Sequence, residues 1–300
     1  MTIEKILLGL FDKSVLDYFK HKQRGGQSNQ DGNRYENFFA VSQLIELFYI
    51  LLNNTNATDI QIYIQADAFV DDLLIVDEQH SSYRHFQLKN AQQLSWGNGL
   101  KSLADDFYKQ KQINVHQNIQ YTALTLVCSQ PKAFEKLVNN IPTEIMSFSK
   151  VIYFPVADTL NQLILSHVDF KESLEKICFS NESDKLEALA ILILGHWQDK
   201  QTTVNSVHEL LRELQAKFPN YLIKNNLTID SLLPQVRAIF AEITDFSYNI
   251  QHGYFHWNYM NLESGVVLYP IDSNEFNNIQ RTVIAQYPRH FDDLVGILLL

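Results

Sequence analysis

The sequence predicts an α/β domain in the first half of the chain and a mainly helical domain in the second half. Three short stretches rich in β-branched and aromatic residues follow one another between residues 60 and 90, which is typical of a strand meander. A helical segment and a near-continuous apolar run come next, and this order indicates a crossover into a buried strand. From about residue 160, apolar residues recur mostly at helical spacing.

Composition limits the classes of function that this chain can serve. Its 300 residues are 46% hydrophobic, enough for one large or two ordinary domains with real cores. The net charge of −10 excludes a generally basic nucleic-acid-binding protein, so any contact with phosphates must be local. Cys128 and Cys178 lack Cys-x-x-Cys spacing, which favours a reduced, cytoplasmic protein over a disulfide framework or a zinc knuckle. The apolar run 7–11 is too short for a membrane span or a signal core.

Two helical segments and a loop are expected before the meander. Residues 1–24 are weakly helical and read as an N-terminal arm. Residues 21–34 are polar and contain three glycines, which predicts a loop. Residues 35–52 are strongly apolar at helical spacing and predict a buried helix. Glu36 would then lie in the first turn, where an acid is ordinarily a partner of the helix dipole.

The strands are expected at 60–65, 69–76 and 83–90, and two of them carry polar residues suited to chemistry. Asp71 and Asp72 open the second strand, and Gln87 and Lys89 lie two apart on the third, so the pleat points both to one face. A helix at 100–112, a strand at 120–129 and a helix at 131–138 complete the expected domain, residues 25–150, with an αβββαβ core and a mixed sheet.

Residues 151–300 are expected to form a mainly helical interaction or assembly domain, with the boundary between about 140 and 158. Three helices followed by short strands have the layout of a winged helix. The helices and strands are expected at 160–166, 173–179, 185–197, 204–218, 231–240, 246–251 and 265–269.

A carboxylate, an amide oxygen and an ammonium group at one end of a sheet are suited to metal-assisted phosphodiester hydrolysis. Asp72, Glu36 and the Gln87 oxygen can hold Mg²⁺ or Mn²⁺, because such hard cations prefer oxygen ligands. Lys89 can orient or deprotonate water, or stabilise the phosphorane. The choice between Asp71 and Asp72 as the metal ligand stays open, with Asp72 favoured. Both Asp72 and Lys89 are expected to be exposed in a cleft.

Glu36 on the first helix, Asp71-Asp72 at the start of a strand and Gln87-Leu88-Lys89 on the next strand resemble the PD-(D/E)xK restriction-like nuclease superfamily. The similarity covers about residues 25–140 and includes the order of the elements. It is closest to the branch that supplies the DNA-cutting domain of bacterial antiviral systems of the CBASS or Lamassu type. Gln87 stands where the superfamily usually has an acid, which is a known variation there.

The resemblance implies a metal-dependent endonuclease acting on double-stranded DNA, as the effector of an anti-phage or anti-plasmid defence system. The implied partners are further copies of the chain in a homo-oligomer, or a sensor or SMC-like defence subunit, and no membrane. The alternative is a catalytically inactive subunit that keeps the fold and binds DNA or a protein partner. Two observations support this alternative: the net charge of −10 and the missing acid before Lys89.

Two other patterns have plainer interpretations. His252 and His256 have helical metal-ligand spacing, but Gly253 and the neighbouring aromatic residues favour a strand or a turn over a zinc pair. The aromatic residues at 254–259 can stack on bases, but a core or an assembly surface is the favoured interpretation.

Overall fold

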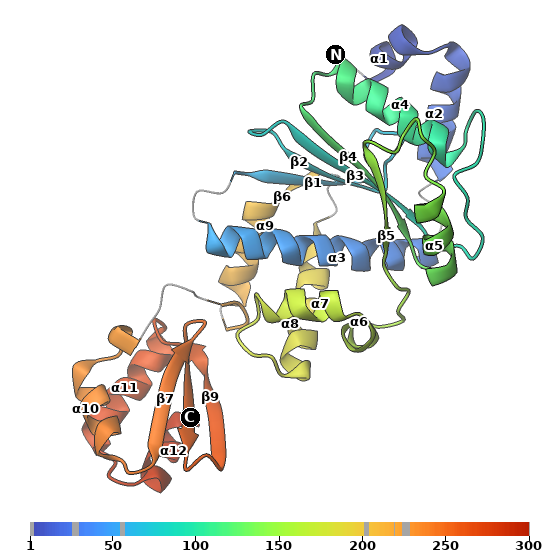
Figure 1. Ribbon diagram of the computed structural model, residues 1–300. Coiled ribbons are helices and arrows are strands. Elements are labelled where there is room, and N and C mark those ends of the chain that lie inside the picture. Colours follow the sequence, from blue (N-terminus) through green and yellow to red (C-terminus); the bar gives the residue numbers. More distant parts are fainter. Residues whose placement is uncertain are drawn as a thin grey trace.

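The protein is an α/β structure built on a mixed six-stranded sheet, with a separate three-stranded antiparallel sheet toward its end (Figure 1). The structure is a computed structural model and describes residues 3–25, 30–54, 58–200, 204–218, 220–223 and 229–299. The strand order of the larger sheet is β5-β4-β3-β2-β1-β6, and that of the smaller sheet is β7-β8-β9.

The expected meander and crossover are present in the larger sheet. Strands β1, β2 and β3 are antiparallel neighbours, β4 runs parallel to β3, and β5 runs parallel to β4. Helices α4 and α5 make the two crossovers. These elements are β1 (Ile60–Ile64), β2 (Leu73–Asp77), β3 (Ser82–Lys89), α4 (Leu103–His116), β4 (Tyr121–Cys128), α5 (Pro131–Asn139) and β5 (Ser149–Tyr153). The predicted order of helix, three strands, helix and strand is therefore confirmed.

Helix α3 (Gln30–Asn53) covers one face of this sheet. Because side chains alternate along a strand, Ile75 and Phe86 point into the core that α3 shares, whereas Leu74 and His85 point to the opposite, α4 face. The predicted loop at 21–34 is wrong where the chain is described. Helix α2 (Lys13–Gly25) runs through its start and α3 covers its end, while residues 26–29 lie outside the described residues.

The N-terminal arm packs on the α4 side of the sheet as two helices, α1 (Ile3–Leu10) and α2. Buried apolar residues of both helices, including Phe19, form a cluster with Phe69 and Ile113. The rings of Phe19 and Phe69 meet edge to face with centroids 5.0 Å apart. Phe69 lies in the segment that leads into β2, so the arm supports the part of the chain that carries Asp71 and Asp72.

Four helices of the second half share the core of α3. The Trp197 indole N–H donates to Asn37 Oδ1 of α3 at 3.1 Å, and strand β6 (Val204–Ser206) pairs with β1. The expected boundary between about 140 and 158 therefore does not separate two cores, because apolar residues on both sides of it are buried together. These helices are α6 (Leu160–Ser166), α7 (Val168–Glu175), α8 (Ser183–Asp199) and α9 (Val207–Lys217).

The last part of the chain, residues 229–299, has an apolar cluster of its own around Phe240, Phe255 and Phe276. The expected winged helix is not formed, because α8 and α9 pack on α3 and, among the described residues, α10 is the one α-helix left to precede the strands. Strand β8, which lies where the aromatic residues after Gly253 favoured a strand or a turn, completes the small sheet. The elements are η1 (Ile229–Ser231), α10 (Pro234–Glu242), β7 (Phe246–Gln251), β8 (Tyr254–Tyr259), β9 (Glu263–Pro270), α11 (Asn274–Gln286) and α12 (Phe291–Leu298).

Candidate active site

The candidate residues gather where β2 begins and β3 ends. These strands are antiparallel and Leu73 is paired with Phe86, so the residue before β2 lies beside the last residues of β3. Asp72 precedes β2, while Gln87 and Lys89 belong to the end of β3. The sheet therefore brings together residues that are 15 or more positions apart in the sequence.

Asp72 is held by two hydrogen bonds. The Gln87 side-chain amide and the backbone N–H of Leu88 both donate to its Oδ2, the latter at 2.6 Å. Asp72 and Gln87 are only 9% and 1% exposed. The expectation that Asp72 is exposed in a cleft is therefore wrong, because its carboxylate accepts the bonds that join the two strands. Lys89 is half-buried.

The structure places Asp71 differently from Asp72. Asp71 is buried, and its charge contributes to raising the pKa of the Tyr18 hydroxyl on α2, behind the larger effects of burial and of Asp106 and Asp105. Its backbone carbonyl accepts from the N–H of Ala66 at 2.8 Å. It is Asp72 whose carboxylate is seen bonded to the end of β3.

Glu36 lies close enough to the pair to interact with it electrostatically. Burial and then the charge of Asp72 raise the pKa of Glu36 to about 7, while the hydrogen bond from Gln65 and the charge of Lys89 act in the opposite direction. Glu36 lies beyond the first turn of α3, which begins at Gln30, so the dipole-partner interpretation of this acid is wrong.

Gln65 belongs to the site, although nothing in the sequence singled it out. Its Nε2 donates to Glu36 Oε2 at 3.2 Å, and its backbone N–H donates to the Asp72 carbonyl at 3.3 Å. It follows β1 directly and has a φ of 49°, in the left-handed region. The one sequence signal that could have identified Gln65 is its place as a polar residue at the end of the strand that precedes the two aspartates.

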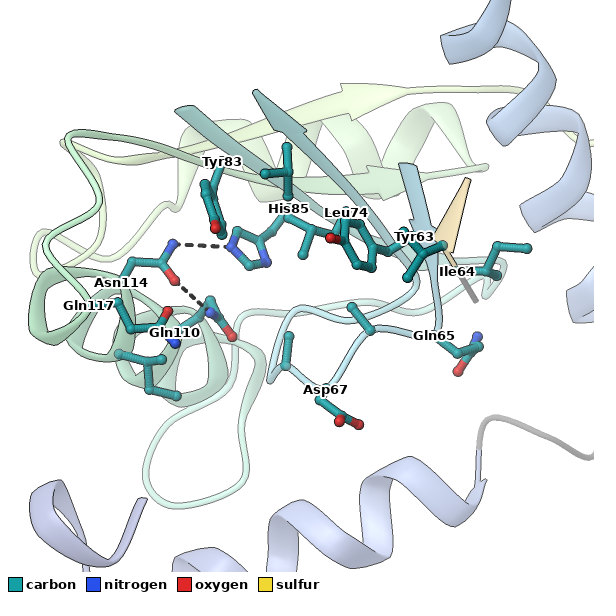
Figure 2. A pocket seen from close by; sticks show the side chains of 15 residues that line it. Tyr63, Ile64, Gln65, Asp67, Leu74, Tyr83, His85, Gln110, Asn114 and Gln117 are labelled. Atoms are coloured by element: carbon teal, nitrogen blue, oxygen red, sulfur yellow. Dashed lines mark hydrogen bonds between the residues drawn. The ribbon is translucent and has the colours of Figure 1, made fainter. Parts of the chain in front are cut away.

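A ring of hydrogen bonds fixes the segment that leads to the aspartates, and Figure 2 shows the two of them that Asn114 makes with His85 and Gln110. Within it, His85 Nδ1 lies 3.2 Å from the Val70 carbonyl, which can only accept, so this nitrogen carries the proton. The other ring nitrogen then accepts from Asn114 Nδ2 at 3.1 Å. Gln110 donates to Asn114 Oδ1 and accepts from the N–H of Phe69, both at 2.8 Å, which closes the ring.

The ring contains a neutral histidine. Burial lowers the pKa of His85 to about 4, against the smaller opposing effects of its two hydrogen bonds. The ring ties β3 and α4 to residues 69–70, one residue before Asp71, so it positions the backbone of the candidate site. Nothing in the sequence singled out His85, Gln110 and Asn114, because a polar residue on a strand or helix is normally expected to face solvent.

The donor set can be compared with the needs of a hard cation. Glu36 and Asp72 supply carboxylate oxygens and Gln87 an amide oxygen, the ligand types that Mg²⁺ prefers. The repulsion that Asp72 exerts on an ionised Glu36 is the kind of interaction that a cation between them would relieve. Over the described ranges, no group of three or more His, Cys, Asp or Glu residues could hold a metal ion. Mg²⁺ is commonly held by one or two carboxylates with waters in the remaining positions, and Glu36 and Asp72 fit a cation bound in that way.

The other candidate patterns do not build a site of this kind. His252 lies in the β7–β8 turn with a φ of 54°, and His256 lies in β8; burial lowers the pKa of both. Tyr254 and Phe255 are fully buried, and Trp257 is 7% exposed. These aromatic side chains therefore serve as core, as the favoured interpretation had it.

Comparison with protein-family models, with curated proteins and with solved structures finds no match to this chain. The resemblance to the nuclease superfamily consequently depends on the residues and the element order alone. Within the part of the chain that the structure describes, no helix has both the length and the apolar character needed to cross a membrane.

Proposed function

We propose that the protein is a metal-dependent endonuclease that hydrolyses phosphodiester bonds of double-stranded DNA, as the effector of a prokaryotic defence system against phages or plasmids. The observation that carries the proposal is the grouping of Asp72, Gln87 and Lys89 at one end of a mixed αβββαβ sheet, with Glu36 of α3 close by. The order of the elements and the residue types at this place resemble those of the PD-(D/E)xK superfamily, with Gln87 in place of the usual acid.

In this mechanism Asp72 and Glu36 would hold Mg²⁺ or Mn²⁺, helped by the Gln87 oxygen after its amide turns over. The bound cation would lower the pKa of a water and neutralise charge on the phosphate. Lys89 would orient that water or stabilise the charge that develops on the phosphate oxygens. Gln65 would hold Glu36 in place through its 3.2 Å hydrogen bond. The ring of hydrogen bonds that contains His85 would hold the backbone before Asp71 and Asp72 in position.

The direct test is cleavage of plasmid DNA by the purified full-length chain with Mg²⁺ or Mn²⁺, alone and with any activating partner that copurifies with it. Nicking or linearisation that disappears on chelation, and returns when the metal is restored, is the expected result. A variant carrying Lys89→Ala serves as the control for contaminating nucleases. Cleavage that persists in chelator, or that Lys89→Ala leaves intact, contradicts the proposal.

One observation favours the second candidate, a subunit with the same fold and no catalysis. The amide nitrogen of Gln87 already donates to Asp72, so the pair satisfies itself as a structural contact. DNA binding without cleavage under all metal conditions, undisturbed by Lys89→Ala, would be the result that selects it.

The C-terminal part, residues 229–299, is proposed to mediate self-association or binding of a sensor or SMC-like subunit. It has its own apolar cluster. Tyr254 anchors it to the main core: the centroids of the Tyr254 and Phe179 rings are 4.8 Å apart, and the Tyr254 hydroxyl donates to the Leu222 carbonyl at 3.4 Å. Such a contact can hold a partner-binding module in a defined position on the α/β unit.

A further inference from the structure

A cavity of about 380 Å³ opens on the α4 face of the sheet, next to the candidate active site (Figure 2). Its volume falls in the range of about 300–1,000 Å³ that is usual for small-molecule sites. Tyr63 of β1, Leu74 and Val76 of β2, and Tyr83 and His85 of β3 line the sheet side. Cross-strand pairing explains this surface, since Leu74 lies between Tyr63 and His85, and Val76 lies beside Tyr83.

The chemistry of the lining selects an uncharged ligand. None of the described residues around the cavity is Lys or Arg, and Asp67 adds a carboxylate at its edge. Glu78 lies just outside, where it accepts from the Tyr83 hydroxyl at 3.2 Å. His85 is bonded to the Val70 carbonyl and to Asn114, and the Tyr83 hydroxyl is bonded to Glu78, so these rings offer hydrogen-bonded polar groups and no cation. A phosphate or carboxylate would find no counter-charge here.

The hydrogen bonds of the lining select a flat ligand over a hydroxyl-rich one. The deep polar groups, His85, Gln110 and Asn114, are bonded to one another and to the backbone. A sugar buried against them would leave hydroxyls without partners, which is costly. An aromatic heterocycle instead presents π-faces to the tyrosines and needs only a few bonds at its edge. Gln65 and the exposed Gln117 lie at that edge.

We infer that this cavity binds a nucleobase, stacked against Tyr63 and Tyr83 over the aliphatic floor of Leu74 and Val76. Gln65 connects it to the candidate active site, because this residue lines the cavity and its side chain donates to Glu36. The base can come from a free nucleoside, in which case the cavity is an effector site, or from an unstacked nucleotide of bound DNA, in which case it contributes to substrate recognition. Only the second source rests on the proposed nuclease function.

The first arm of the test uses the full-length chain in chelator, so that it depends on neither metal nor cleavage. Adenosine, guanosine, cytidine and thymidine are titrated separately by calorimetry, with inorganic phosphate as the negative probe. Tyr63→Leu and Tyr83→Leu should each weaken binding roughly tenfold or more, because a stacking surface is lost. Tyr49→Leu, which changes an exposed tyrosine of α3, is the matched control and should have no effect.

The second arm uses duplex DNA containing 2-aminopurine, whose fluorescence rises when the base leaves the stack. Binding of the wild-type chain in chelator should raise this fluorescence, and Tyr63→Leu should suppress the rise. Val204→Trp provides a variant that spares the core, since Val204 lies on the rim of the cavity and is 41% exposed. Its indole should block both nucleosides and the flipped base.

The two arms separate the sources of the base. Tyrosine-dependent binding of nucleosides identifies a free ligand, and a tyrosine-dependent fluorescence rise identifies a base of the substrate. The inference is overturned if neither signal occurs, if the signals survive Tyr63→Leu, Tyr83→Leu and Val204→Trp, or if phosphate binds in place of nucleosides. Nucleoside binding in a chain that cuts no DNA would contradict the nuclease proposal and leave this one standing.

Discussion

The side-chain amide of Gln87 donates a hydrogen bond to the carboxylate of Asp72, and both residues are buried. The bond joins the end of β3 to the start of β2, and the backbone N–H of Leu88 donates to the same oxygen. Asp72 therefore has a structural role in addition to its proposed role as a metal ligand. Substitutions at this position must be chosen so that the two roles can be separated.

Asp72→Ala should lower the free energy of unfolding by about 1–3 kcal/mol, because the Gln87 amide and the Leu88 N–H lose a buried acceptor. Asp72→Asn keeps an acceptor oxygen of similar shape, so it should destabilise less while abolishing metal-dependent cleavage. Urea unfolding and a plasmid assay measure the two effects. Asp71→Asn is the matched control. If Asp71→Asn abolishes cleavage and Asp72→Asn does not, the metal ligand is Asp71 and not Asp72.

Lys89→Ala should reduce the cleavage rate by about 10²–10⁴, the usual range for a positioned proton-transfer group. Its effect on the free energy of unfolding should be small, because the side chain is only half-buried. Lys150→Ala, at an exposed position of β5, is the matched control for a lost positive charge. A large loss of stability in Lys89→Ala with unchanged cleavage would mean that this lysine is structural.

Metal affinity should rise with pH through about 7. The pKa of Glu36 is raised to about 7 by burial and by Asp72, so below that value a cation must displace the proton of Glu36 before both carboxylates can bind it. Titration calorimetry with Mn²⁺ at about pH 6 and about pH 8 should show an affinity up to roughly tenfold lower at the acidic pH. Glu36→Gln should bind more weakly and lose this dependence. An unchanged pH dependence in this variant would exclude Glu36 as a ligand.

The stability of the fold should fall as the pH falls from about 6.5 to about 4. His85 has its pKa lowered to about 4 by burial, from an ordinary value of 6.5, so within this window the unfolded chain binds more protons than the folded chain. The contribution is fully present above pH 6.5 and amounts to roughly 3 kcal/mol.

Urea unfolding across this pH range tests the His85 contribution. His85→Gln should be less stable than the wild type at neutral pH, because the hydrogen-bonded ring is broken, but its stability should depend less on pH. His290→Gln, at the exposed residue before α12, should keep the wild-type pH profile. Parallel profiles for His85→Gln and the wild type would contradict the assignment of His85 as the titrating group.

A chain ending at Ile223 should fold and lose self-association. The core around α3 lies almost wholly before that residue, whereas the cluster of residues 232–298 is separate. Circular dichroism compares the folding of the fragment with that of the full chain, and sedimentation compares their oligomeric states. The full-length variant Tyr254→Phe, which removes only the hydroxyl bonded to Leu222, is measured beside them. A fragment with the same oligomeric state as the full chain would refute the assembly role of residues 229–299.

Local alternation was enough to predict the meander and the faces of β3. The sequence Phe86-Gln87-Leu88-Lys89 alternates apolar and polar residues, and Phe86 and Leu88 do enter the core under α3. The near-continuous apolar run of β4 likewise predicted a strand buried on both faces after a crossover. Such features depend on neighbours in the sequence, so the sequence alone determined them.

Tertiary contacts decided what those patterns left open. Helical spacing in α8 and α9 shows that each helix has an apolar face but not which core receives it, and both faces pack on α3. The burial of Asp72 and the roles of Gln65 and His85 likewise follow from partners 15 or more residues away. Because a buried polar group is stabilised only by the partner that the fold brings to it, its role became visible only in the tertiary structure.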